Sequence, residues 1–351
     1  MSVINDIKKA ITFKRTNKWP EKHVESYDGF DYKSVLPCDR SLLYGKSEAH
    51  QIPEFPADIN KLALITCHFN PCGYKSPVNN FWKFVDGLGD YTEHLYVAEL
   101  SFNDNFSINL PNTFRFRGRR EDQLVWQKER LLNALIDKVP YSYDAIAWLD
   151  SDILFLNNNW YKATIDVLRC YKICQMYEYS HWLDEFGRVA LSRPSCGHEY
   201  HNNWGHHSKC WQLSHAHPGY CWAARSDLLR KVRLYDFNIT GGGDAVMLIG
   251  FFNSKIWWKF NNKWLSNISK WSLNSYENTM ASVGYVPIDI MHLYHGSREN
   301  RQYVSRWQLL VNNNYNPDDL YIDNNGLLTW HDESALSRAV EEYFITRQDD
   351  N

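Results

Sequence analysis

The sequence predicts an α/β fold with a mostly parallel central sheet flanked by helices. Apolar segments of strand length alternate with amphipathic segments of helix length, and this alternation is typical of parallel strands joined by crossover helices. The chain has 351 residues, of which 44% are hydrophobic, so it can fill one large core. Because parallel sheets bind their ligands beyond the carboxyl ends of the strands, polar residues at those ends are the first candidates for a site.

The expected elements follow one another in this order. In the first half, strands are expected at residues 62–67, 94–100 and 145–149, with helices at 78–88 and 122–138. In the second half, a short helix follows residue 157, strands are expected at 172–177, 219–224 and 286–292, and a helix at 245–252. Residues 1–60 are polar, contain four prolines and lack periodicity, so they are expected to be an N-terminal extension packed on one domain of residues 61–351.

Bulk composition excludes several classes of partner. The 38 basic and 41 acidic residues give a net charge of −3, so no overall field attracts nucleic acid or an anionic membrane. The N-terminus has no signal-peptide pattern and no apolar run is long enough to span a bilayer, which predicts a cytoplasmic protein without membrane insertion. The eight cysteines show no secreted disulfide pattern, and we expect them to be reduced.

Two carboxylates follow the strand at residues 145–149. Asp150 and Asp152 project to the same side, because residues two apart share a face of a strand. Carboxylate oxygens suit Mn²⁺ or Mg²⁺, which retain several waters and bridge to substrate phosphates. The same triplet also occurs in solvated turns and helix caps, so further motifs have to support the metal interpretation.

Four motifs in order along the chain carry a resemblance. They are Asp150-Ser-Asp152, the segment 218–227 (Pro-Gly-Tyr-Cys-Trp-Ala-Ala-Arg-Ser-Asp), Gly241-Gly-Gly-Asp244, and the segment 292–301 with its two histidines and two arginines. Together they resemble the metal-dependent nucleotide-sugar glycosyltransferases of the GT-A fold, a Rossmann-like α/β domain. The last third of the chain is also similar to glycosyltransferase-like proteins of bacteriophages and bacteria. The chain departs from the better-known members in having two candidate histidines and Gly-Gly-Gly-Asp in place of Gly-Gly-Glu-Asp.

The resemblance implies a hexosyl- or pentosyltransferase that uses a nucleotide sugar, with UDP favoured, and Mn²⁺ or Mg²⁺. It implies a nucleotide- and metal-binding half at 61–157 and an acceptor half at 158–351 with a C-terminal metal and diphosphate segment. The expected metal ligands are Asp150, Asp152 and one of His292 and His295. Asp244 is the candidate base that takes the acceptor proton, and the alternative is that it only N-caps the following helix.

Donor contacts are expected at the end of the first strand, on the helix before the metal strand, and around the metal motifs. Ordinary loop polarity, a solvated helix face and a salt-bridge cluster with Glu299 are the respective alternatives. The candidates are Thr66, His68, Asn70, Lys128, Arg130, Asp150, Ser151, Arg298 and Arg301.

The acceptor side is expected to include a basic amphipathic helix. Residues 255–271 combine aromatic residues at helical spacing with a stripe of lysines, and residues 253–272 contain no acid. This pattern and the phage resemblance favour a hydroxymethylated pyrimidine in phage DNA as acceptor, with a surface or lipid-linked glycan as the rival. The expected acceptor residues are Trp222, Gly242, Gly243, Lys255, Lys259 and Lys263. The histidine-rich region between Cys196 and Cys221 lacks regular zinc-ligand spacing.

Two other functions remain open on the sequence. The same fold could carry out nucleotidyl transfer from a nucleoside triphosphate to a sugar phosphate, but no Gly-rich, basic phosphate loop follows the first strand. A carbohydrate or nucleic-acid binding module without catalysis would lack the metal pair and the base, and candidates for both are present.

Overall fold

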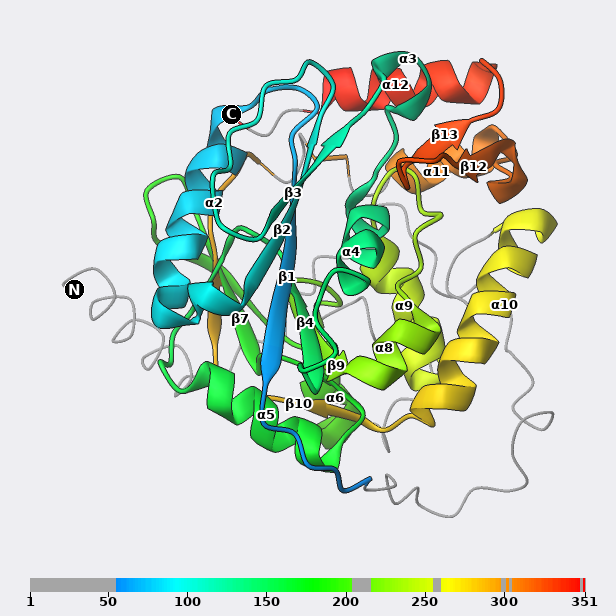
Figure 1. Cartoon of the computed structure of the whole chain (residues 1–351). Helices are drawn as coiled ribbons and strands as arrows, with labels where there is room; N and C mark the ends of the chain where they lie inside the picture. Colours follow the sequence, from blue (N-terminus) through cyan, green and yellow to red (C-terminus); the bar gives the residue numbers. More distant parts are fainter. Residues whose placement is uncertain are drawn as a thin grey trace.

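A central seven-stranded sheet with helices on both faces organises the chain (Figure 1). The computed structural model describes residues 55–203, 216–254, 260–297, 301–302, 305–347 and 350. The strand order is β10-β6-β9-β4-β1-β2-β3. The strands are β1 (Leu62–Phe69), β2 (Leu95–Ser101), β3 (Thr113–Arg117), β4 (Ala145–Leu149), β6 (Ile173–Gln175), β9 (Cys221–Arg225) and β10 (Val283–Tyr285). The predicted α/β class with a mostly parallel sheet is confirmed.

Strand β9 departs from the parallel pattern. Strands β1, β2, β3 and β4 pair in parallel, as do β6 and β10, whereas β9 is antiparallel to both β4 and β6. The described part of the connection from β6 to β9 contains β7, β8 and α6, and the chain re-enters the sheet at β9 in the opposite direction. The alternation of strands and helices in the sequence therefore overpredicted parallel pairing.

A second sheet lies beside the carboxyl end of β4. Its order is β5-β11-β7-β8, and it contains β5 (Ile153–Phe155), β7 (Tyr179–Leu183), β8 (Val189–Pro194) and β11 (Ile290–His292). The expected strand at 286–292 is thus wrong in extent, because only its last three residues form β11, and they belong to the second sheet. A separate hairpin is formed by β12 (Leu320–Ile322) and β13 (Leu328–Trp330).

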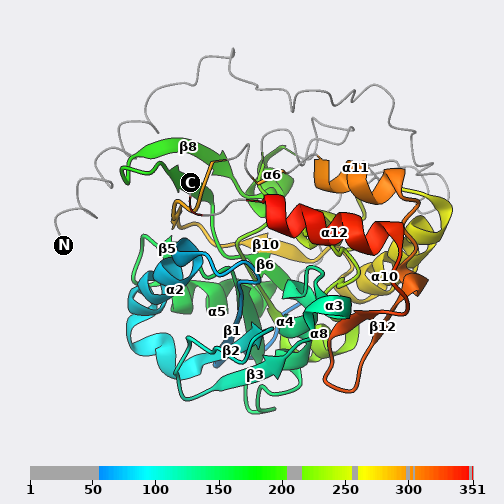
Figure 2. The same cartoon turned by 90° about the horizontal axis from the view of Figure 1, so that it is seen from above.

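Alternating side chains of the central strands fill two apolar cores. Leu62 and Leu64 face one core, and Ala63 and Ile65 face the other, as the two-residue period of a strand requires. Both faces are covered by helices, so the strands read as continuous apolar runs. Figure 2 shows α2 and α5 on one side of β1 and β2, with α4 and α8 on the other.

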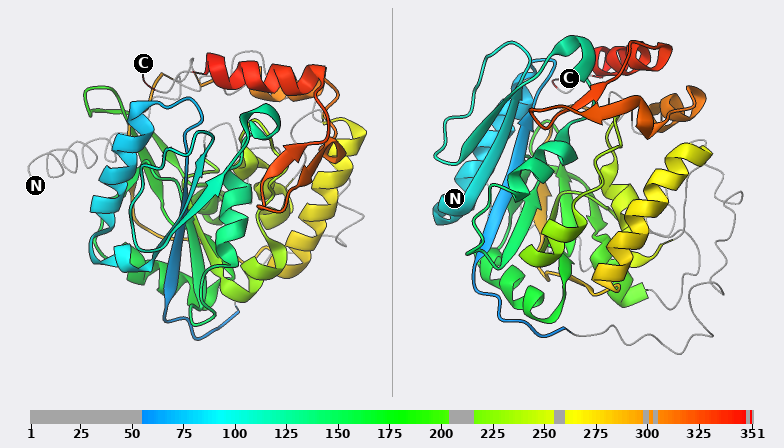
Figure 3. Two further views of the ribbon diagram at one scale, coloured as in Figure 1. Left: turned by 45° about the horizontal axis from the view of Figure 1, so that its top comes forward. Right: turned by 45° about the vertical axis from the view of Figure 1, so that its right-hand side comes forward.

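The helices flank the sheet and also cross its carboxyl edge. They are α2 (Lys75–Leu88), α3 (Arg120–Gln123), α4 (Lys128–Ile136), α5 (Trp160–Cys170), α6 (Cys196–Asn203), α8 (Ser226–Val232), α9 (Gly243–Phe252), α10 (Asn262–Thr279), α11 (Ser305–Asn312) and α12 (Ala335–Thr346). Two short 3₁₀ helices, η3 (Gly89–His94) and η4 (Pro317–Asp319), also lie within the described residues. Figure 3 shows α12 across the top of the molecule, at the edge where β1 ends.

The helix expected at 122–138 is broken into α3 and α4. The fully buried amide of Gln127 donates to the carbonyls of Gln123 and Leu328 and accepts from the Leu328 N–H. The backbone N–H of Trp126 donates to the carbonyl of Ile239. These long-range hydrogen bonds replace helical ones, and Lys128 consequently becomes the first residue of α4.

The basic helix expected at 255–271 is also corrected. Helix α10 begins at Asn262, and the side chain of Asn261 caps it by accepting from the N–H groups of Lys263 and Trp264. Lys255 and Lys259 lie outside the described residues. Since Asn261 has an extended backbone, no single helix carries the three lysines as one stripe.

The residues just before β1 pack on α5. The N–H groups of Phe55 and Ala57 donate to the carbonyls of Cys170 and Arg169. Residues 1–54 lie outside the described part, so the extension and the division of 61–351 into two halves stay predictions. Among the described helices, none is both long enough and apolar enough to cross a bilayer. The six cysteines within the described ranges are free thiols.

Candidate active site

The turn Asp150-Ser151-Asp152 carries the chain from the central sheet into the second sheet. The N–H of Asp150 donates to the carbonyl of Tyr220 at 2.7 Å, and the N–H of Leu293 donates to the carbonyl of Asp152 at 2.8 Å. Tyr220 has a φ of 79°, which a non-glycine residue rarely adopts. Such a backbone is held in place by its surroundings and is often found at functional sites. Both ends of the turn are therefore fixed.

Three potential metal ligands converge at this turn. The Oδ2 atom of Asp152 lies 3.0 Å from Nε2 of His295 and 3.6 Å from Nε2 of His292, and the two histidine nitrogens are 3.1 Å apart. His292 is the last residue of β11 and pairs with Ile153 in β5. The other carboxylate oxygen of Asp152 is buried and has no hydrogen-bond partner among the described residues.

This arrangement fits a divalent cation better than a hydrogen-bond network. The Nε2 atom of His295 faces a donor, Arg301 Nη1 at 2.9 Å, and at the same time an acceptor, Asp152. A neutral imidazole nitrogen cannot accept from one and donate to the other. Ligands at right angles with bonds of about 2.1 Å are about 3.0 Å apart, close to the observed separations. The triangle, together with the orphaned oxygen of Asp152, thus fits a bound metal ion.

The charges of these ligands are also appropriate. Burial lowers the pKa of His295 to about 4, and the nearby Arg301 acts in the same direction. Burial would raise the pKa of Asp152, but contacts with His292 and His295 hold it well below its usual value. At neutral pH the site therefore offers an ionised carboxylate and a neutral imidazole, which are the forms that bind metal.

Asp150 does not join this triangle, contrary to the expected ligand set. Its Oδ1 lies 2.5 Å from the ammonium of Lys128, which is also 3.8 Å from Asp244. Burial would lower the pKa of Lys128, but the two carboxylates raise it well above its usual value. Burial raises the pKa of Asp150 to about 7, while Lys128 opposes that shift. Of the expected metal residues, Asp152 and both histidines converge.

Asp244 lies in the first turn of α9 but does not cap it. The N-cap is Gly242, with a φ of 87° and no side-chain cap, so the capping alternative for Asp244 is wrong. A side chain at Gly219 would place its Cβ 2.9 Å from Oδ2 of Asp244, so the glycine leaves room for the carboxylate in its present position. The carboxylate is partly exposed and stands beside Lys128.

A second carboxyl group supports the first turn of α9. Glu129 is only 3% exposed, and a Cβ at Gly243 would lie 2.8 Å from its Oε1 atom. Burial raises the pKa of Glu129 to about 8, with Asp244 contributing and Lys128 opposing. The sequence suggested Lys128 and Arg130 of this helix as donor contacts, with a solvated face as the alternative, and gave no signal for Glu129 between them.

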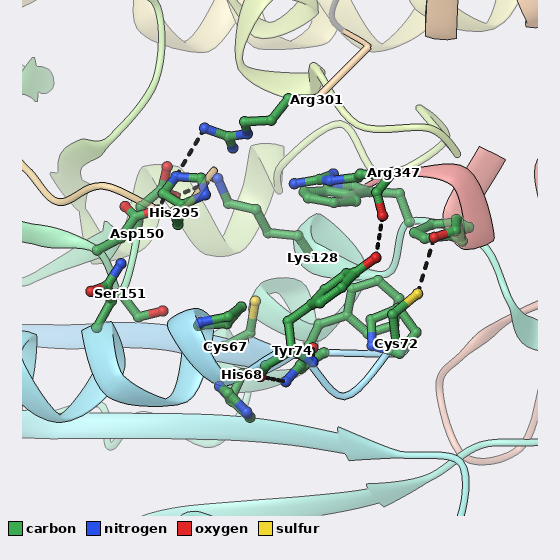
Figure 4. Close-up of a pocket in the computed structure, with 18 of the residues that line it drawn as sticks. Cys67, His68, Cys72, Tyr74, Lys128, Asp150, Ser151, His295, Arg301 and Arg347 are labelled. Carbon is green, nitrogen blue, oxygen red and sulfur yellow. Dashed lines mark hydrogen bonds and ion pairs between the residues drawn. The ribbon is translucent and has the colours of Figure 1, made fainter. Parts of the chain in front are cut away.

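One pocket lies at the carboxyl ends of β1 and β4 (Figure 4). His292, Asp244 and Glu129 lie behind its wall and are not lining residues. Among the expected residues, His68, Asn70, Lys128, Asp150, Ser151, Asp152, His295 and Arg301 line it. Lining residues that the sequence did not suggest include Cys67, Tyr74, Asn80, Trp126 and Arg347. Arg347 lies far along the chain and outside any motif, so no local signal pointed to it.

Three expected binding residues are placed elsewhere. Thr66 is buried and donates its hydroxyl to the carbonyl of Leu149. Arg130 pairs with Asp236 at 2.9 Å instead of lining the pocket. Trp222 is 1% exposed and stacks on Trp148 in the core, so it has almost no surface to offer an acceptor.

The remaining expected residues give a mixed result. Gly242 packs against Trp307, and Gly243 packs against Glu129, so both serve close packing at the start of α9. Lys263 is exposed in the first turn of α10. Arg298 lies outside the described residues.

Comparisons with known proteins give only distant likenesses. No protein-family model and no curated protein matches the sequence. The solved structure of Staphylococcus aureus TarS 1–349 with UDP-GlcNAc is similar over 82% of this chain and 72% of its own, at 10% identity and a TM-score of 0.40. A Drosophila β1,4-galactosyltransferase 7 mutant in complex with manganese, UDP-Gal and xylobiose is similar over 65% of each chain, at 12% identity and a TM-score of 0.32. A 4-diphosphocytidyl-2C-methyl-D-erythritol synthase from Anaerococcus prevotii is similar over 65% of this chain and 87% of its own, at 10% identity and a TM-score of 0.30. At this level of similarity, function has to be argued from the site itself.

The metal triangle predicts which carboxylate matters for cation binding. Asp152→Asn and His295→Gln should weaken Mn²⁺ binding by more than the roughly 10-fold that loss of an outer-shell partner costs. Asp150→Asn should leave the affinity close to wild type, because its carboxylate pairs with Lys128. Titration of Mn²⁺ followed by electron paramagnetic resonance measures this. Equal losses in the Asp150 and Asp152 variants would show that both carboxylates bind the metal.

The buried Glu129 predicts a pH-dependent stability. The folded protein holds this proton up to about pH 8, whereas an unfolded glutamate releases it near pH 4.3. Relative to Glu129→Gln, the wild type should therefore lose stability as pH rises from about 5 to about 8, with a slope approaching about 1.4 kcal/mol per pH unit. Thermal unfolding across this pH range measures the difference, with the exposed Glu341→Gln as control. A difference that stays constant with pH would refute the assignment.

Proposed function

We propose that the protein is a metal-dependent glycosyltransferase of the GT-A type, which transfers a sugar from a nucleotide sugar, with UDP favoured, to an acceptor hydroxyl. The observation that carries this proposal is the Asp152, His292 and His295 triangle beside a pocket that also contains cationic side chains. A cation site next to basic groups suits a diphosphate leaving group. The order of four motifs along the sequence supports the same function.

The chemistry requires stabilisation of the departing diphosphate. When the bond from the sugar carbon to the phosphate oxygen breaks, its electron pair goes to that oxygen, and negative charge accumulates there. A bound divalent cation would supply charge neutralisation at this oxygen. Lys128 and Arg301, which both line the pocket, add positive charge that is fixed in place before the reaction.

Asp244 is the proposed base. As the acceptor oxygen forms its bond to the sugar carbon, the hydroxyl proton passes to the Asp244 carboxylate. The position beside Gly219 leaves space at the carboxylate, and Lys128 keeps positive charge near it. The buried side chain of Glu129 packs against Gly243 at the start of α9.

The acceptor is proposed on sequence grounds. A hydroxymethylated pyrimidine in phage DNA stays our first candidate, with the cytoplasm as the site of action. The extended backbone at Asn261 interrupts the lysine stripe that favoured DNA. Surface and lipid-linked glycans are therefore tested beside it.

Donor turnover tests the proposed function directly. With Mn²⁺ and a panel of nucleotide sugars, the protein should release a nucleoside diphosphate, fastest from a UDP-sugar, and EDTA should abolish the release. Acceptor panels of modified DNA and glycans, read by mass spectrometry, identify the product. Pyrophosphate release from a nucleoside triphosphate and a sugar phosphate would show nucleotidyl transfer instead. No turnover of any nucleotide sugar would contradict the proposal.

The Asp244→Asn variant tests the base. It keeps the shape of the side chain but cannot accept the proton, so transfer should slow by about 10² or more while donor affinity stays nearly unchanged. Asp227→Asn is a matched control, because Asp227 is also the second residue of a helix but lies on α8. Steady-state kinetics and donor titration separate the two effects. An Asp244 variant that retains the wild-type rate would rule out this role.

A further inference from the structure

We propose that Arg347 is a diphosphate-binding residue, and that Asp350 is a positioning residue that pins Arg347 over the pocket. We use the name strap for four residues near the C-terminus: Phe344, Thr346, Arg347 and Asp350. This inference rests on the proposed function and extends it to a segment beyond every motif of the sequence.

Backbone carbonyls of the strap bind the pocket wall, and Thr346 binds Gln302 beside it. The thiol of Cys72 donates to the carbonyl of Phe344 at 3.0 Å, and the Tyr74 hydroxyl donates to the carbonyl of Arg347. The side-chain amide of Gln302 donates to the hydroxyl of Thr346 at 3.0 Å. Cys72 and Tyr74 themselves line the pocket. Figure 4 shows Tyr74 and Cys72 reaching across to this segment.

The side chain of Asp350 caps the N-terminus of helix α2. Its carboxylate accepts from the N–H groups of Lys75 at 2.9 Å and Ser76 at 2.8 Å, the first two residues of α2. The N-cap residue Tyr74 provides no side-chain cap, and the first turn contains no acid. Asp350 therefore supplies both the missing acceptors and the negative charge that a helix N-terminus favours.

Arg347 presents its guanidinium to the pocket. The residue is 7% exposed, and its guanidinium lies over the ring of Trp126 at 5.0 Å, with Nη1 3.5 Å from the Tyr343 hydroxyl. A ring beneath a planar guanidinium orients it, and its forked donors match phosphate oxygens.

The charge balance of the pocket agrees with an anionic ligand. The lining residues include three cationic side chains, those of Lys128, Arg301 and Arg347, and two carboxylates, those of Asp150 and Asp152. Asp244, which Lys128 also contacts, brings the two signs into balance, so a bound divalent cation would make the local charge positive. A neutral nucleoside gains nothing from it, whereas a diphosphate does.

Binding of UDP, uridine and inorganic pyrophosphate in the presence of Mn²⁺ tests the inference by calorimetry. Arg347→Gln should weaken UDP and pyrophosphate binding by about 10-fold to 100-fold, the range for a charge-assisted hydrogen bond, and leave uridine unchanged. Arg347→Lys should recover part of the loss. Asp350→Ala should weaken UDP binding by about fivefold, as expected for loss of a helix cap, and Asp350→Asn should recover part of the loss because its amide oxygen can still accept a hydrogen bond. Arg338→Gln, on the exposed side of α12, is the matched control and should match wild type.

The probes separate this inference from the proposed function. Suppose that wild type binds UDP. If Arg347→Gln binds UDP equally well, or if its affinities for UDP and uridine fall by the same factor, the strap inference is overturned and the function stands. If wild type binds pyrophosphate through Arg347 but no nucleotide, the function fails and the strap stands. Binding of neither probe by wild type would overturn both.

Discussion

The antiparallel pairing of β5 with β11 is the constraint on which the site depends. It sets Ile153 opposite His292, and the bond from the Leu293 N–H to the Asp152 carbonyl continues the ladder by one step. A slip of one residue would turn His292 to the opposite face of the second sheet and separate it from Asp152. The hydrogen bond from Asp150 to Tyr220 fixes the other end of the same turn. Backbone hydrogen bonds of two sheets thus determine the distance between the candidate metal ligands.

The charged side chains around Lys128 depend on a second constraint, the interruption between α3 and α4. The buried amide of Gln127 binds β13 and ends the helical pattern, so Lys128 starts a new helix and reaches both Asp150 and Asp244. Glu129, the next residue, turns inward against Gly243. The ammonium of Lys128 thereby compensates negative charge on Asp150 and Asp244, which would be unfavourable in this partly buried environment without a cation.

The sequence identified the parts of the site that carry short-range signals. Short motifs predicted Asp152 at a strand end and His292 and His295 near the C-terminus. The geometry of parallel sheets predicted that the carboxyl ends of β1 and β4 lie together. The places of Glu129 and Trp126 could not be predicted, because Glu129 packs against Gly243 and the Trp126 N–H binds the carbonyl of Ile239, both far along the chain. The break in the expected helix at 122–138 and the burial of Trp222 have the same cause. Local periodicity predicts which residues form a helix or strand, but not which tertiary hydrogen bonds interrupt it.

The ties of the strap also affect the order in which the pocket can form. Tyr74 and Arg347 are 273 residues apart, and Lys75 and Asp350 are 275 residues apart. Contacts of such sequence separation close large loops and raise the contact order of the fold. Because Phe344 and Arg347 line the pocket, its wall is complete only when this distant segment has docked against Tyr74 and the start of α2.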